Sequence, residues 1–190
     1  MDDGDSRSGI GRGAAPDAAP DGAADRQLVV EVVDDDGDWS AFGDVAAAVT
    51  AAARLLQGTP EIALGRDGAS AAVALSSDSA VRALNHSFRG NDKPTNVLSF
   101  PAPPPVTSAA TGGSPRFLGD VVLAAETVLG EAAELGIPPV HHLQHLVVHG
   151  LLHLLGFDHE TDEDAERMEA LETRLLARIG IDDPHGERRA

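Results

Sequence analysis

Residues 138–159 read PPVHHLQHLVVHGLLHLLGFDH, and this stretch decides the fold. Pro138 and Pro139 stand where a helix can begin, and the residues that follow, up to about Leu155, are apolar on nearly every side. A helix without a polar face has to be buried. The sequence therefore predicts a central, histidine-bearing helix around which the rest of the chain packs.

Three histidines of this stretch have the spacing of metal ligands. His149 and His153 are four residues apart, so both lie on one face of a helix. Gly156 can take a left-handed conformation and turn the chain back, which would bring His159 to the same ion. Three imidazoles with one open position are typical of a catalytic zinc site. Nickel, copper and iron also accept imidazole, so the spacing alone predicts a metal without fixing which one.

The other histidines are expected to have different roles. Six of the eight fall between His141 and His159 in an otherwise apolar run, and burying imidazoles without partners is costly, which favours metal binding over solvated side chains. His145 is followed by no glycine turn, so we expect it to have a structural or ligand-supporting role. His86 and His185 are isolated in the sequence, and we expect both at the surface.

The composition excludes several classes of protein and of site. The 190 residues fit one domain, and the absence of cysteine excludes disulfides and thiolate ligands. No apolar stretch is long enough for a bilayer, and residues 1–5 lack the basic start of a signal peptide. We therefore expect a cytoplasmic protein without a membrane partner. Asp and Glu outnumber Lys and Arg by 31 to 14, and the resulting net charge of −17 argues against broad adhesion to nucleic acid.

One segment has the opposite charge. Between Ser79 and Gly119 there are four basic residues and a single acid, Asp92, so that this segment carries a net charge of +3. The basic residues are Arg82, Arg89, Lys93 and Arg116. Two interpretations stay open at this point: a few solvated charges, or a small anion-binding surface that faces the metal.

The hydrophobic pattern predicts an α+β domain, with a small mixed β-sheet packed with helices around the central helix. Strands are expected at about 28–33, 61–64, 71–75, 96–100 and 118–123. Helices are expected at about 40–56, 80–88, 124–135, 138–155 and 162–179. Asp38 or Ser40 is expected to cap the first of these helices, and Ser77 and Asp78 are expected to cap the second.

The composition along the chain predicts three regions. Residues 1–26 are rich in Gly, Ala, Asp and Pro without an apolar period, so we expect a disordered N-terminal extension. Residues 27–181 are expected to form a single catalytic domain, and residues 182–190 a flexible tail. Within the domain, residues 101–116 hold five of the chain's twelve prolines, which predicts a loop.

Three blocks of the sequence resemble a known family. The block HGLLHLLGFDHE at residues 149–160 closely resembles the signature of the YbeY family, bacterial metal-dependent endoribonucleases that act in ribosomal RNA maturation. Two further blocks agree, LNHSFRGNDKPTNVLSFP at residues 84–101 and LGDVV at residues 118–122. Their order along the chain argues against accidental similarity. One departure is visible, because Asn96 stands where family members commonly have Asp.

The resemblance implies the chemistry of the site. It implies one Zn²⁺ ion per chain on His149, His153 and His159, with Arg89 and His149 as catalytic residues. Zinc-bound water or hydroxide would attack a phosphodiester, while Arg89 would position the phosphate.

The resemblance also implies the substrate. This would be single-stranded RNA, in particular ribosomal RNA, with roles in processing the 3′ end of 16S rRNA and in ribosome quality control. Because an acidic surface binds RNA weakly, we also expect help from a ribosomal protein or a ribosome-associated partner.

Two alternatives stay open. The spacing H-x-x-x-H-x-x-G-x-x-H is also that of metzincin zinc proteases, so the local geometry is expected to be zincin-like. Those proteases place Glu directly after the first histidine as general base, whereas this chain has Gly150. A glycine in the middle of a helix indicates close packing or ligand access there. The second alternative is a non-catalytic metal-binding ribosome assembly factor, which the lack of an obvious carboxylate base keeps open.

Overall fold

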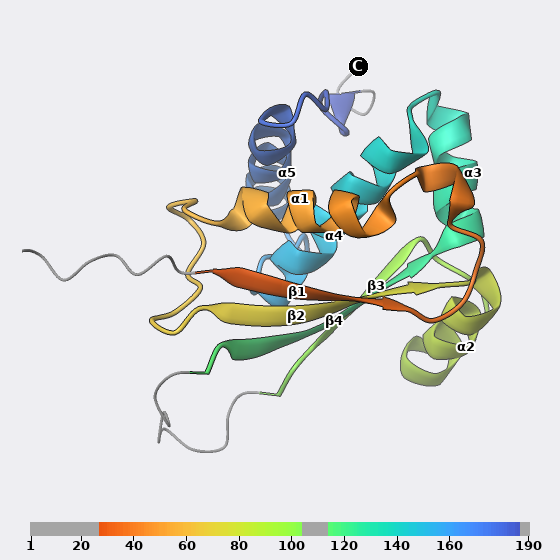
Figure 1. Ribbon diagram of the computed structural model, residues 1–190, viewed down its shortest axis with the longest axis horizontal. Coiled ribbons are helices and arrows are strands. Elements are labelled where there is room, and N and C mark those ends of the chain that lie inside the picture. Colours follow the sequence, from red (N-terminus) through yellow and green to blue (C-terminus); the bar gives the residue numbers. More distant parts are fainter. Residues whose placement is uncertain (1–26, 104–113, 187–190) are drawn as a thin grey trace, which may run out of the picture.

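The computed structural model describes residues 27–103 and 114–186, which are built on one four-stranded sheet (Figure 1). The strands are β1 (Leu28–Asp34), β2 (Ala69–Ser76), β3 (Val97–Pro101) and β4 (Arg116–Ala124). Their order in space is β1-β2-β4-β3. β1 pairs parallel with β2 and β2 pairs parallel with β4, whereas β3 pairs antiparallel with β4 at the edge. The predicted small mixed sheet of an α+β domain is thus confirmed.

Helices occupy both faces of this sheet. They are the 3-10 helix η1 (Ser40–Phe42) and the helices α1 (Val45–Leu56), α2 (Asp78–Arg89), α3 (Ala125–Leu135), α4 (Pro139–Leu154) and α5 (Asp162–Ala177). Figure 1 shows α2 on the opposite side of the sheet from α1 and α4. The strands alternate accordingly: Leu98 of β3 belongs to the apolar cluster under α2, and Val97 packs against the main core.

Polar side chains set several of the helix boundaries. The side chain of Ser77 accepts a hydrogen bond from the backbone N–H of Ala80, which confirms the predicted cap of α2. The predicted cap of the first helix was wrong, because Asp44 caps α1 and residues 40–42 form the separate helix η1. Gly43, at a φ of 75°, ends η1 and thereby separates the two helices.

The strand predicted at residues 61–64 is absent. The backbone N–H of Ile62 instead donates to the carbonyl of Thr59 in a turn between α1 and β2. Leu64 is buried in the main core all the same, so its burial needs no strand. The remaining predicted elements are present with shifted ends. The predicted extension at residues 1–26 and residues 104–113 of the predicted loop lie outside the described residues.

Helix α4 has contacts with every neighbouring layer of the main core. It packs against β3 and β4 on one side and against α1, α3 and α5 on the others. Leu143, Val147 and Leu151, one or two turns apart, are fully buried. The C-terminal end of α4 is thereby fixed between the sheet and α5, where the histidines lie. Within the described ranges, no helix combines the length and the apolarity that a membrane crossing requires.

Candidate metal centre

The last turns of α4 and the turn that follows bring three histidines together. His149 and His153 project from the helix, which gives way to a turn at Leu155. Gly156, at a φ of 91°, lies in the left-handed region, which only glycine adopts without strain. The chain then reverses, and His159 returns to the end of the helix. One ring nitrogen of each of the three histidines lies within 4.8 Å of the other two.

The separation of the ring nitrogens fits a shared ion. Nε2 of His149 lies 3.1 Å from Nε2 of His153. Two ligands of one tetrahedral zinc ion, each with a bond of about 2.0–2.1 Å, lie about 3.3 Å apart. His149 and His153 are half-buried and His159 is exposed, so one side of the group faces solvent. The donor set and its spacing therefore suit a transition metal with an open coordination position.

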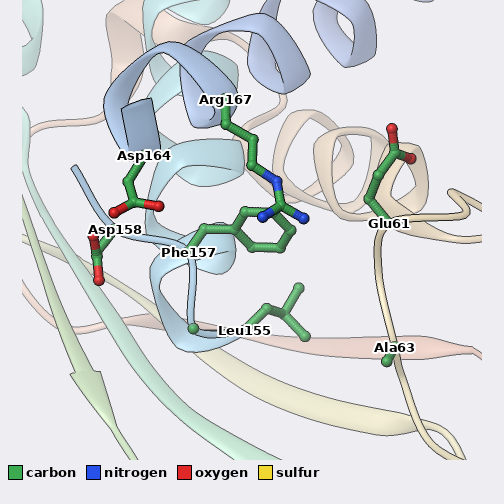
Figure 2. Close-up of a pocket in the computed structure, with 8 residues that line it drawn as sticks. Glu61, Ala63, Leu155, Phe157, Asp158, Asp164 and Arg167 are labelled. Atoms are coloured by element: carbon green, nitrogen blue, oxygen red, sulfur yellow. The ribbon is translucent and has the colours of Figure 1, made fainter. Parts of the chain in front are cut away.

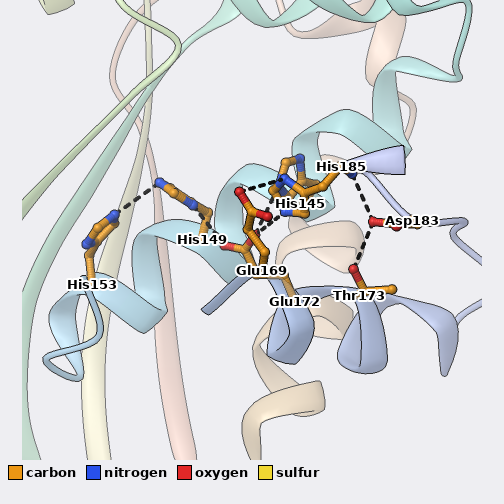
Figure 3. A network of polar contacts seen from close by, with 8 residues as sticks. All are labelled: His145, His149, His153, Glu169, Glu172, Thr173, Asp183 and His185. Atoms are coloured by element: carbon orange, nitrogen blue, oxygen red, sulfur yellow. Dashed lines mark hydrogen bonds and ion pairs between the residues drawn. The ribbon is translucent and has the colours of Figure 1, made fainter. Parts of the chain in front are cut away.

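A buried carboxylate orients the first of these histidines (Figure 3). Nδ1 of His149 donates a hydrogen bond of 2.8 Å to Oε1 of Glu172, which comes from α5 and is only 1% exposed. This bond fixes the tautomer, so that Nε2 faces His153 with its lone pair available, as in carboxylate–histidine–metal arrangements. The sequence analysis did not predict Glu172 as a residue of this site. The sequence feature that could have indicated it is the position of this carboxylate on the buried face of α5, four residues after Met168 and three before Leu175.

The environment shifts the pKa of several groups in the site. Burial lowers the pKa of His153, and the neighbouring His149 and His159 lower it further, which keeps this imidazole neutral and able to bind metal. Burial alone would raise the pKa of Glu172, but the hydrogen bonds from His149 and His185, together with the nearby His145, outweigh it and lower this pKa below its usual range. Glu172 is therefore an anion at neutral pH, and histidines surround it.

The prediction that His185 lies at the surface was wrong. Its side chain is buried, and its Nε2 donates a hydrogen bond of 2.6 Å to Oε2 of Glu172. Residues 182–186, which were expected to belong to a flexible tail, fold back against α5, while residues 187–190 lie outside the described part. His145, which was expected to support the site, lies 3.5 Å from the same carboxylate oxygen through its Nε2.

A second buried histidine engages another carboxylate. Nε2 of His142 lies 2.7 Å from Oε2 of Glu131, which also accepts a hydrogen bond from Nδ2 of Asn96 at 2.9 Å. An aspartate at position 96 would place two carboxylates side by side here. The amide of Asn96 therefore fits the partner that this chain provides, and no acidic role falls to that position.

A pocket of about 260 Å³ lies beside the turn that leads from α4 to His159 (Figure 2). The guanidinium of Arg167 lies 5.9 Å from the ring centroid of Phe157. The carboxylates of Glu61, Asp158 and Asp164 also line the pocket. Acidic groups outnumber the single cation, so this pocket does not favour a phosphate.

Arg89 makes no hydrogen bond or ion pair with the three histidines in the part of the chain that the structure describes. It is exposed and is the last residue of α2, a helix that lies on the opposite side of the sheet from α4 (Figure 1). The charge of Arg82, in the same basic segment, is compensated by Asp92, which accepts two hydrogen bonds of 2.7 and 2.8 Å from it.

Gly150 allows α4 to approach the sheet closely. A Cβ atom at this position would lie 2.7 Å from Cγ1 of Val121 in β4 and 3.2 Å from Oγ of Ser99 in β3. Oγ of Ser99 also donates a hydrogen bond of 3.2 Å to the carbonyl of Gly150. The predicted close packing is confirmed. A side chain at position 150 would point into the sheet, so the position at which metzincins carry their general base is closed here.

We expect the substitution Gly150→Ala to destabilise the protein. Alanine favours a helix over glycine by up to ~1 kcal/mol, but the new methyl would collide with Val121, which is fully buried and stiff at χ1. Overpacking of this kind costs about 1–3 kcal/mol, so the free energy of unfolding in urea should fall. Gly130→Ala in α3 is the matched control, because a Cβ there meets nothing within 4 Å. An equal gain in stability for both variants would contradict the close approach.

Comparisons with known proteins agree on one family. Residues 41–180 match the family model described as Endoribonuclease YbeY. The chain is 56% identical over 120 residues to the endoribonuclease YbeY of Bradyrhizobium diazoefficiens, covering 63% of this chain and 66% of that protein. It is 50% identical over 157 residues to that of Azorhizobium caulinodans, covering 81% and 93%. It is 46% identical over 171 residues to that of Sinorhizobium medicae, covering 87% and 96%.

A solved structure shares the fold. The solution structure of a Thermotoga maritima protein superimposes with a TM-score of 0.53 and 22% sequence identity, covering 85% of this chain and 92% of that one. At this identity the likeness speaks for the fold alone.

Proposed function

The chain belongs to the YbeY family of endoribonucleases, which are hydrolases, and from this premise we propose that it cleaves single-stranded RNA at its three-histidine site. The observation that carries the proposal is the convergence of His149, His153 and His159 beside the buried Glu172. We propose Zn²⁺ as the metal, with one ion per chain, because three imidazoles and an open position suit it. The helix and turn that hold it are proposed to be zincin-like.

Each residue of the site is proposed to have a different role in hydrolysis. When bound, the metal would supply a Lewis acid that lowers the pKa of water to ~7. Glu172 holds His149 in the orientation that metal binding requires, and burial keeps His153 neutral. His159 enters from the exposed turn, so the open side of the site faces solvent, where an RNA strand can reach it. Arg89 is proposed to hold the scissile phosphate through its planar pair of donors.

The competing functions differ in what they would cleave. A metzincin-like protease needs a carboxylate next to the first histidine, and Gly150 packs against Val121 at that position. An assembly factor would bind metal and cleave nothing. We therefore propose to incubate the metal-loaded protein with labelled single-stranded RNA and, in parallel, with an unfolded protein. RNA cleavage that stops on chelation is the expected result. Cleavage of the protein substrate alone would establish the protease, and metal binding without any cleavage would establish the assembly factor.

The substrate and its delivery follow from the family and the charge. We propose ribosomal RNA as the substrate, with the 3′ end of 16S rRNA as the processed site, and a further role in ribosome quality control in the cytoplasm. A net charge of −17 weakens RNA binding. A ribosomal protein or a ribosome-associated partner is therefore proposed to bring the enzyme to its substrate.

We propose that the catalytic domain begins at residue 27 and that residues 1–26 are dispensable for it. Residues 1–26 have no apolar period, and the family match begins at residue 41. Deleting them should leave the melting temperature nearly unchanged in a thermal scan. A longer deletion through residue 34 is the control, because it removes β1 and its pairing with β2 and should prevent folding. A large drop for the shorter deletion would show that the extension packs on the core.

A further inference from the structure

The segment after α5 carries a histidine back toward the metal centre. Oδ1 of Asp183 accepts hydrogen bonds of 2.9 Å from the hydroxyl of Thr173 and of 2.9 Å from the backbone N–H of His185. This turn directs the His185 side chain inward, where it is 7% exposed. The family match ends at residue 180, so His185 lies outside the matched region.

His185 and His149 hold the two oxygens of one carboxylate (Figure 3). Oε2 of Glu172 accepts from Nε2 of His185 at 2.6 Å, and Oε1 accepts from Nδ1 of His149 at 2.8 Å. Clamped on both sides, the carboxylate loses its rotational freedom and presents Oε1 to His149 in one orientation. His185 is therefore connected to a metal ligand through a single intervening side chain.

Distances distinguish this clamp from a second metal site. One ligand atom each from His145, Glu172 and His185 lies within 4.8 Å of the others, which is close enough for an ion. However, the 2.6 Å between His185 and Glu172 is shorter than the separation of about 3.3 Å that two zinc ligands require. Nδ1 of His185 also lies 3.9 Å from a second carboxylate, Glu169. A hydrogen bond to Glu172, with the second carboxylate near the other ring nitrogen, accounts for both distances, and the hydrogen bond to Glu172 raises the pKa of His185.

We propose that His185 is a positioning residue of the metal centre: it fixes Glu172, which in turn fixes His149 toward the ion. The proposal rests on the metal binding proposed above and extends it to the C-terminal segment. Loss of a side chain that supports a metal ligand typically weakens binding by about 10–100-fold. Glu172, in contact with the ligand, should lie at the upper end of this range. His185, one contact further out, should lie near about 10-fold.

The test measures metal affinity in the full-length chain. Zinc dissociation constants from competition with a chelator would be compared for His185→Ala, His185→Gln and the wild type, with Co²⁺ absorption as a probe of ligand geometry. We expect His185→Ala to bind zinc about 10-fold more weakly and to change the Co²⁺ spectrum. Glutamine keeps an N–H donor at a similar reach and should restore most of the affinity. His86→Ala, at an exposed histidine of α2, is the matched control and should leave both readouts unchanged.

A double variant separates positioning from a general loss of structure. If His185 acts through Glu172, then His185→Ala should cost little further affinity in a Glu172→Gln background, because the two changes break one connection. Additive losses, or wild-type affinity in His185→Ala, would overturn the proposal. A second bound equivalent of metal that disappears in His185→Ala would also overturn it, in favour of a second metal site. None of these readouts uses RNA cleavage, so the failure of the endoribonuclease proposal would be recognised separately.

Discussion

The variant His153→Ala is expected to lose its metal and, with it, all cleavage of RNA. Two imidazoles remain after this change, and the pair of nitrogens 3.1 Å apart that defines the site is broken. Removing a ligand should weaken binding by more than the ~100-fold that loss of a supporting partner costs. Elemental analysis after dialysis measures this loss directly. Metal should also raise the melting temperature of the wild type but not that of the variant, because the native state with its site intact binds the ion more tightly than the unfolded chain does.

The control for this experiment lies on the same helix. His141, in the first turn of α4, does not belong to the group of three, so His141→Ala should retain its metal. His149→Ala should behave as His153→Ala does, and it should additionally leave Glu172 without one of its partners. Full metal retention in both His149→Ala and His153→Ala would refute the assignment of the ligands.

The variant Arg89→Glu is expected to abolish RNA cleavage with metal content and folding intact. Removing a donor that stabilises developing charge costs about 10²–10³-fold in rate, and the reversed charge would repel the phosphate as well. Arg89→Lys should also be impaired, because a point charge does not reproduce the planar two-donor grip. Single-turnover cleavage of labelled RNA, with metal content measured in the same samples, gives the comparison.

The position of Arg89 means that a substrate bound by both Arg89 and the metal centre must contact residues from both sides of the sheet. Arg89 is the last residue of α2, and α2 and α4 lie on opposite sides of the sheet, where both contact its edge strand β3. A substrate held by both would have to pass over the edge at β3. Arg66→Glu, an exposed arginine in the turn before β2, is the charge-matched control and should cleave normally. Wild-type cleavage by Arg89→Glu would disprove the phosphate-holding role.

The local part of the site could be predicted from the sequence, and the long-range part could not. His149, His153 and His159 lie within one short stretch, so helical spacing and one glycine define their geometry. Glu172 and His185 reach the site from α5 and beyond, and periodicity indicates only which face of a helix is buried, not what it contacts. The strand expected at residues 61–64 failed for a related reason, since a short apolar run does not tell a paired strand from a turn that buries one leucine.

Because the three histidines come from one continuous stretch, we expect them to stay within reach of one ion even in a chain whose sheet has not formed. The parallel pairs of β1 with β2 and of β2 with β4 join distant segments and should form slowly. The unfolded chain therefore competes with the native protein for the ion. Metal stabilises the fold by less than its native affinity alone would give, since only the difference between the two affinities counts. We expect that difference to come from Glu172 and His185, because their contacts around His149 join segments far apart in the sequence and exist only in the folded chain.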